Sequence, residues 1–215
     1  NIEDDLEQLR DFDWVVEVII ENLEIKRNLY SKLSKHIGPN TILSSNTSTL
    51  PRTELIAELP AEVASRFLIT HFFNPPRYLP LLEVVTSPEV DEDIVQRFCR
   101  FADLKLGKRV TMCNDRPGFI GNRLGIYFIQ RAFKATLDHG LSVEQADAML
   151  GRPIGLPKTA VFALMDLVGI DLIPHVTQSL LSHLPDEDPF HQIAGAGEDI
   201  VLSLIHISEP TRRLI

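Results

Sequence analysis

The chain has 215 residues, of which 44% are hydrophobic, enough to build one large domain or two small ones around a real core. Its net charge of −9 argues against a general nucleic-acid-binding protein, although a local basic patch could still hold an anionic ligand. The two cysteines are too few for a disulfide scaffold and lack the spacing of a metal site, and no apolar run is long enough for a membrane span, so we expect a cytoplasmic globular protein.

Residues 13–112 alternate short apolar runs with segments of helical periodicity. The β-like runs cover residues 14–20, 41–45, 66–73, 81–87 and 108–113, and helix-like segments cover 23–37 and 91–107. This alternation predicts an α/β fold, with the first three runs as parallel strands covered on both faces. The loop 74–80 is too short for a crossover helix, so the strand after it should run antiparallel and bring Glu83 back toward His71.

From residue 114 onward the periodicity is helical. Pro117 lies near a predicted helix start, Gly140 is a predicted C-cap, and Ser142 with Gln145 forms a capping-box pattern for residues 143–150. We therefore expect an α/β domain over residues 1–114 and an all-helical domain over residues 115–201.

Several polar side chains stand where open α/β sheets bind ligands. His71 ends a β-like run, and a carboxylate on its second ring nitrogen would fix its tautomer and favour the imidazolium, although a lone histidine here is more often a core or surface group. The run SSNTSTLP at residues 44–51 follows another predicted strand and could equally be an ordinary turn. Asn122 sits among apolar residues just inside a helix, which asparagine does not favour. Glu21 and Lys26 could be only a strand end and a helix start.

The order of these segments resembles one enzyme family. The runs VVEVIIENLEIKRNLY, SSNTSTL, HFFNPP, LLEVV, RPGFIGNRL and DLVGID are similar to those of the 3-hydroxyacyl-CoA dehydrogenases of fatty-acid β-oxidation, over about residues 3–180. HFFNPPRYLPLLEVV and GLPKTAVFALMDLVGID look most like the bifunctional type, in which an enoyl-CoA hydratase is fused on the same chain. The resemblance implies NAD as cofactor, acyl-CoA as substrate, and a Rossmann-type dinucleotide-binding domain followed by a helical domain. It also implies that a homodimer could form through the helical domain.

The resemblance also implies roles for individual residues. His71 would take the proton from the 3-hydroxyl group of the substrate, with Glu83 as its carboxylate partner, and Ser48 and Asn122 would hydrogen-bond the substrate oxygen. The residues expected near the cofactor or the coenzyme A tail are Glu21, Lys26, Asn46, Ser48 and Asn74.

The chain departs from the family at both ends. No G-x-G-x-x-G motif occurs in the sequence, so we expect only the C-terminal part of the NAD-binding domain, missing an upstream segment and binding NAD poorly as written. Residues 202–215 contain LSLIHISEPTRR, which resembles the translation of a sequencing-library adapter, and we interpret them as a non-native tail.

Two other functions fit the same architecture. One is another β-hydroxyacid dehydrogenase acting on a small acid, but such enzymes usually transfer the proton through a helical lysine rather than through a histidine and a glutamate in the sheet. The other is a non-catalytic protein on the same fold, comparable to a lens crystallin. The presence of His71, Glu83, Ser48 and Asn122 together argues against it.

Overall fold

The computed structural model describes residues 6–169 and 172–194, and the predicted tail at 202–215 lies outside them. The chain divides into two compact units, Asn1–Ile120 and Gly121–Ile215. Among the described residues, no helix is both long and apolar enough to cross a membrane.

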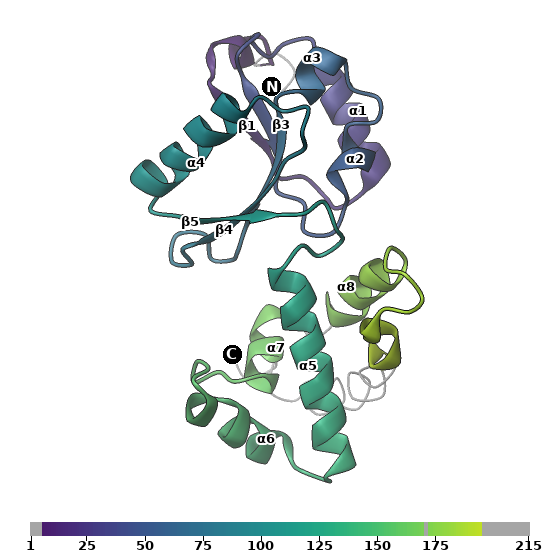
Figure 1. Cartoon of the computed structure of the whole chain (residues 1–215). Coiled ribbons are helices and arrows are strands. Elements are labelled where there is room, and N and C mark those ends of the chain that lie inside the picture. The colour runs from purple at the N-terminus through teal and green to yellow at the C-terminus, as the bar shows by residue number, and fades with distance from the viewer. Residues whose placement is uncertain (1–5, 170–171, 195–215) are drawn as a thin grey trace. The chain divides into compact units, whose positions relative to one another are not determined.

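The first unit is built around a five-stranded sheet in the order β1-β2-β3-β4-β5 (Figure 1). The strands are β1 (Trp14–Glu17), β2 (Ile42–Ser45), β3 (Phe67–Phe72), β4 (Leu81–Val85) and β5 (Arg109–Cys113). The helices are the 3-10 helix η1 (Leu6–Asp11), α1 (Leu23–Leu33), α2 (Arg52–Leu55), α3 (Ala61–Ala64) and α4 (Glu92–Leu106).

The directions of the first four strands agree with those expected from the sequence. β1, β2 and β3 pair in parallel, β4 runs antiparallel to β3, and β5 is parallel to β4. The antiparallel return follows from the short loop between β3 and β4, which has no room for a crossover helix. Both the parallel run and the reversal are thereby confirmed.

Helices cover both faces of this sheet, which explains why its central strands are apolar on both sides. Residues of α1 pack with those of β2 and β3 in one buried cluster, which includes Tyr30, Leu43 and Phe67. On the other face Phe98 of α4 packs with Leu68 and Leu82. Figure 1 shows α4 on the opposite side of the sheet from α1 and α2.

β1 and α1 end three and four residues earlier than predicted. β1 stops at Glu17 instead of residue 20, because the side-chain carboxylate of Glu17 accepts the backbone N–H of Ile19 at 2.6 Å and turns the chain. α1 stops at Leu33 instead of residue 37, because the N–H groups of Lys35 and His36 bond three residues back, to Lys32 and Leu33, and tighten the last turns.

The described part of the second unit is helical and contains no strand, as predicted. Its elements are α5 (Gly121–Asp138), α6 (Val143–Leu150), η2 (Arg152–Ile154), α7 (Phe162–Val168), α8 (Leu172–Leu181) and η3 (Pro189–Gln192). Gly140 has a φ of 60° just after α5, and the capping box of Ser142 and Gln145 starts α6.

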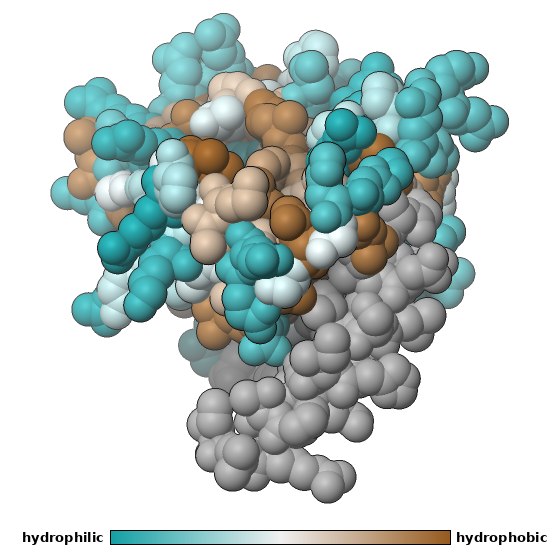
Figure 2. Space-filling model, turned by 90° about the horizontal axis from the view of Figure 1, so that it is seen from below, coloured by the Kyte–Doolittle hydropathy of each residue, from teal (hydrophilic) through white to brown (hydrophobic). Residues whose placement is uncertain are grey.

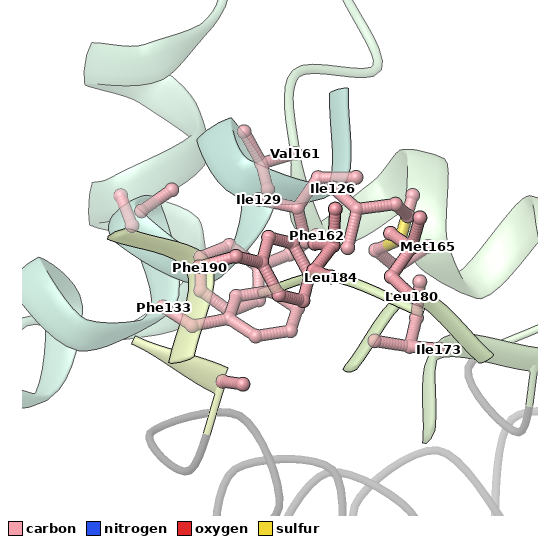
Figure 3. Packing of buried hydrophobic residues seen from close by; sticks show 13 residues of the cluster. Ile126, Ile129, Phe133, Val161, Phe162, Met165, Ile173, Leu180, Leu184 and Phe190 are labelled. Carbon is pink, nitrogen blue, oxygen red and sulfur yellow. The ribbon is translucent and has the colours of Figure 1, made fainter. Parts of the chain in front are cut away.

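The core of the second unit is formed where α5, α7 and α8 meet (Figure 3). Phe133 is fully buried, and its ring centroid lies 4.9 Å from that of Phe162. The carboxylate of Asp147 accepts the N–H groups of residues 161–163 and so satisfies the first turn of α7.

Some large apolar side chains remain exposed on the second unit. They include Leu124, Phe128, Leu137, Met149, Leu167 and Val168. Residues of α5 and α6, among them Phe128 and Met149, also line an apolar hollow of about 330 Å³. Figure 2 shows hydrophobic side chains gathered on one face of the molecule among hydrophilic ones. Exposed apolar surface of this kind is typical of interaction sites.

Candidate active site

A buried histidine and glutamate face each other across β3 and β4. His71 and Glu83 are direct partners in the antiparallel register, and Nδ1 of the imidazole lies 2.8 Å from Oε2 of the carboxylate. Only 6% of His71 and 1% of Glu83 is exposed. Cross-strand partners have neighbouring side chains on the same face of the sheet, so the strand register itself holds the pair together. The expectation that Glu83 returns to His71 is confirmed.

The second oxygen of Glu83 is held as well. Oε1 accepts the backbone N–H of Ile120 at 3.0 Å and lies 3.7 Å from the thiol of Cys113. The carboxylate is therefore anchored at both oxygens and cannot rotate away from the imidazole. This anchoring gives the pair a fixed geometry before any ligand arrives.

The second ring nitrogen of His71 is available for proton transfer. Nε2 of His71 has no hydrogen-bond partner among the described residues, while the rings of Phe73 and Phe119 flank it at centroid distances of 4.6 and 5.8 Å. When Nδ1 carries the proton shared with Glu83, Nε2 presents a lone pair. The histidine can then act as a general base.

The thiol beside Glu83 should be unreactive. Burial, together with the nearby charge of Glu83, raises the pKa of Cys113 from 9.0 to about 11. We expect Cys113 in the folded protein to react with iodoacetamide at pH 8 about a hundredfold more slowly than an ordinary thiol, because only the thiolate reacts. Peptide mass spectrometry at successive times measures the rate.

A pH series separates this effect from simple steric shielding. The rate for Cys113 should rise about tenfold per pH unit until the pKa is reached, and in urea the same thiol should react at the ordinary rate. A rate that levels off near pH 9 in the folded protein would contradict the raised pKa.

The residues after β2 form a second part of the site, which we call the Ser48 loop (residues 46–49). Oε1 of Glu21 accepts the hydroxyl of Thr47 at 2.5 Å and the backbone N–H groups of Ser48 and Thr49 at 3.0 and 3.2 Å. Burial opposes ionisation of Glu21, but these bonds and the charge of Lys26 outweigh it and lower the pKa of the carboxyl. The hydroxyl of Ser48 has no hydrogen-bond partner among the described residues and is half-buried.

Two asparagines lie beside the end of β3. Oδ1 of Asn46 accepts the N–H of Phe72 at 2.9 Å, which ties the Ser48 loop to the strand that carries His71. Asn74 is exposed at the start of the following loop. The buried ammonium of Lys108 holds that loop by donating to the carbonyl oxygens of Pro76 and Leu79.

Lys26 lies in a different environment from the one expected for a ligand contact. It is 1% exposed, and its ammonium lies 2.8 Å from Oε1 of Glu17 and 3.3 Å from Oε2 of Glu21. Its charge is thus paired with the buried carboxylate of Glu17 and the partly exposed carboxylate of Glu21. The predicted contact between Lys26 and a ligand stays a prediction.

Asn122 belongs to the second unit, in the first turn of α5, where it is half-buried. The expectation that it sits just inside a helix is confirmed. Its predicted contact with the substrate oxygen stays a prediction, as do the predicted ligand contacts of Ser48, Glu21, Asn46 and Asn74.

Glu17 and Tyr30 are not among the residues predicted from the sequence. Glu17 is 3% exposed at the end of β1, and the hydroxyl of Tyr30 donates to its Oε2 at 2.5 Å. Burial and the neighbouring Glu17 carboxylate raise the pKa of Tyr30, so the phenol keeps its proton and remains a donor. A charged residue inside an otherwise apolar β-like run is the signal that could have drawn attention to Glu17.

Family models match the chain over nearly all of its described length. A model described as the NAD-binding domain of 3-hydroxyacyl-CoA dehydrogenase matches residues 1–116, and one for the C-terminal domain of that enzyme matches residues 118–197. The chain belongs to the 3-hydroxyacyl-CoA dehydrogenase family. The resemblance of its motifs to this family is thereby confirmed, as is a Rossmann-type domain followed by a helical one.

Curated relatives agree with this family. A putative fatty acid oxidation complex trifunctional enzyme of Rickettsia felis is 43% identical over 90% of this chain and 27% of its own length. A probable 3-hydroxyacyl-CoA dehydrogenase of Deinococcus radiodurans is 42% identical over 88% of this chain and 55% of its own length. This dehydrogenase-family chain thus spans about a quarter to a half of the length of these relatives.

A solved structure shows the same fold. The crystal structure of (S)-3-hydroxybutyryl-CoA dehydrogenase PaaH1 from Ralstonia eutropha matches with a TM-score of 0.80 and 27% identity, over 92% of this chain and 68% of the other. The family models and the solved structure therefore assign the same fold to this chain.

Ser48 and Asn74 carry polar groups at the carboxyl edge of the sheet. The free hydroxyl of Ser48 and the exposed amide of Asn74 are groups that can bond a carboxamide or a ribose at the carboxyl edge of the sheet. The pyrophosphate of a dinucleotide is usually held by a G-x-G-x-x-G turn, and the sequence contains no such motif. No group of three His, Cys, Asp or Glu residues in the described ranges is arranged to hold a metal ion.

Proposed function

We propose that this chain carries the proton-transfer residues of an NAD-dependent 3-hydroxyacyl-CoA dehydrogenase, which oxidises 3-hydroxyacyl-CoA to 3-ketoacyl-CoA in fatty-acid β-oxidation. The observation that supports it most directly is the buried His71–Glu83 pair with Nε2 of the imidazole left without a partner among the described residues. Membership of the dehydrogenase family supplies the reaction class.

In this proposal Nε2 of His71 takes the proton of the 3-hydroxyl group. The imidazolium that results is stabilised by Glu83, whose second oxygen stays bonded to the N–H of Ile120 and so keeps the carboxylate in place. Bound NAD supplies the acceptor for the hydride that leaves carbon 3 of the substrate. The hydroxyl of Ser48 and the amide of Asn122 would hydrogen-bond the substrate oxygen. Asn46, Asn74 and Ser48 would lie near the nicotinamide.

Aromatic rings around the imidazole suit this chemistry. Phe73 and Phe119 border His71 and limit the access of water to its ring. Less water strengthens the attraction between the imidazolium and Glu83 in the charged state.

The partners are proposed from the relatives and from the surface. The relative named as a trifunctional enzyme supports a fused enoyl-CoA hydratase in the full-length protein. The exposed apolar side chains of the second unit, such as Phe128 and Met149, support a homodimer through the helical domain.

The test of this function is a Glu83→Gln substitution in the protein expressed from its complete reading frame. We expect turnover of 3-hydroxybutyryl-CoA with NAD to fall on the order of ten- to a hundredfold, because a neutral amide no longer stabilises the imidazolium. The appearance of NADH by absorbance measures it, and NADH affinity by calorimetry should stay close to that of the unaltered protein.

A Glu62→Gln substitution is the matched control, because Glu62 is an exposed residue of α3 in the same unit. It should leave turnover unchanged. Equal turnover of Glu83→Gln and the unaltered protein would reject the dyad, and an unaltered protein with no oxidation of any 3-hydroxyacyl-CoA would reject the proposed reaction.

A further inference from the structure

The carboxylate of Glu17 lies at the end of β1 and accepts an unusual number of hydrogen bonds. Its donors are Nζ of Lys26 at 2.8 Å, the hydroxyl of Tyr30 at 2.5 Å, Oγ of Ser45 at 2.7 Å and the N–H of Ile19 at 2.6 Å. Burying a carboxylate is costly unless it is paired and fully hydrogen-bonded, and here both conditions hold. An apolar residue at this strand end would avoid the cost of burying a charge. The presence of a carboxylate therefore calls for a role beyond stability.

One chain of contacts runs from Glu17 to the Ser48 loop through Ser45. Oγ of Ser45 donates to Glu17 and accepts the backbone N–H of Thr47 at 3.2 Å. Because the hydroxyl hydrogen of Ser45 points to Glu17, the oxygen lone pairs of Ser45 are free to accept from the loop. The orientation of this hydroxyl therefore depends on the carboxylate.

A second chain of contacts runs through Lys26. Its ammonium lies between Glu17 and Glu21, and Glu21 in turn accepts the N–H groups of Ser48 and Thr49. The ammonium of Lys26 is buried, and of its two carboxylate partners Glu17 is buried and Glu21 is partly exposed. The two chains of contacts start at one carboxylate and end on successive amides of the same loop.

We propose that Glu17 is a positioning residue, which holds the Ser48 loop in a single conformation with the hydroxyl of Ser48 free. The importance of this for the reaction rests on the proposed function, in which Ser48 contacts the substrate oxygen and the nicotinamide. The ordering of the loop itself does not depend on that function. Glu17 touches neither substrate nor cofactor in this scheme and acts through Ser45, Lys26 and Glu21.

The experiment compares amide hydrogen exchange in three single variants of the same chain, resolved by residue with NMR. In Glu17→Gln, exchange at Thr47, Ser48 and Thr49 should rise about tenfold or more. In Ser45→Ala, which removes only the direct chain of contacts, the rise should be confined to Thr47. Glu24→Gln changes an exposed residue of α1 and should alter none of the three.

The exchange of central strand amides serves as an internal reference, because β3 should keep its protection if the fold is intact. Unchanged exchange of all three loop amides in a folded Glu17→Gln variant would overturn the proposal. If Glu17→Gln does not fold, Ser45→Ala decides: unchanged exchange at Thr47 overturns the proposal, and a rise at Thr47 alone supports it.

An activity measurement on the protein from the complete reading frame then separates this proposal from the proposed function. Increased exchange together with a fall in kcat/KM of about tenfold supports both. Increased exchange in a protein that oxidises no 3-hydroxyacyl-CoA would support the positioning of the loop and reject the proposed function.

Discussion

The His71→Gln variant, in the protein expressed from its complete reading frame, should lose about a hundredfold or more of its turnover. Glutamine is close to histidine in size and can still reach Glu83, but its amide cannot accept a proton from the substrate hydroxyl. Nε2 of His71 makes no hydrogen bond among the described residues and is the atom proposed to take the proton. The substitution should therefore lower kcat. NADH formation at saturating substrate measures it.

NADH affinity and the melting temperature distinguish loss of the base from loss of the site. Both should stay near the values of the unaltered protein, because the glutamine fills the space next to Phe73 and Phe119. A His139→Gln variant, in which an exposed histidine of the second unit is changed, provides the control and should be fully active. Near-normal kcat in His71→Gln would show that another group takes the proton.

The Phe133→Ala variant should lose about 3–5 kcal/mol in the free energy of unfolding of the second unit. Phe133 is fully buried in the cluster of α5, α7 and α8 and contacts the ring of Phe162 (Figure 3). Removing its ring leaves a cavity that surrounding helices can fill only in part. Urea denaturation followed by circular dichroism measures the change.

Leu137→Ala is the matched control for this substitution. Leu137 lies one turn further along α5 but is 53% exposed, so its replacement should change the stability by no more than about 0.5 kcal/mol. Equal losses in the two variants would mean that the buried cluster is not what stabilises the unit.

The elements themselves could largely be predicted from local patterns. Alternating apolar runs and helical segments predicted the sheet and its helices, and the capping box at Ser142 placed the start of α6 correctly. The ends of β1 and α1 were predicted too far along the chain. In β1 the reason is a side-chain contact of Glu17 to a neighbouring backbone N–H, which a hydrophobic pattern does not record.

The His71–Glu83 pair could be predicted because its cause is local. A loop too short for a crossover helix forces an antiparallel return, and the register then places the two side chains opposite each other. Knowing which residue types face each other was therefore enough to suggest a dyad. The family resemblance added the reaction to this geometry.

The surroundings of Lys26 could not be predicted in the same way. Its partner Glu17 comes from a strand end and Glu21 from the loop before α1, so burial of the ammonium depends on how β1, α1 and the Ser48 loop come together. In the sequence, a lysine near the ligand-binding edge of the sheet suggests a contact with a ligand. Only its burial shows that its charge is used inside the protein.

The sequence by itself determined the α/β-then-helical order, the directions of the first four strands and the meeting of His71 with Glu83, because short loops and periodicity act over neighbouring residues. The tertiary structure alone decided which carboxylates take which donors: Glu17 with Lys26, Tyr30 and Ser45, and Glu21 with the Ser48 loop. These contacts join residues from separate elements, and those of Glu17 are strengthened by the exclusion of water. Burial of that kind exists only once the sheet and its helices have packed.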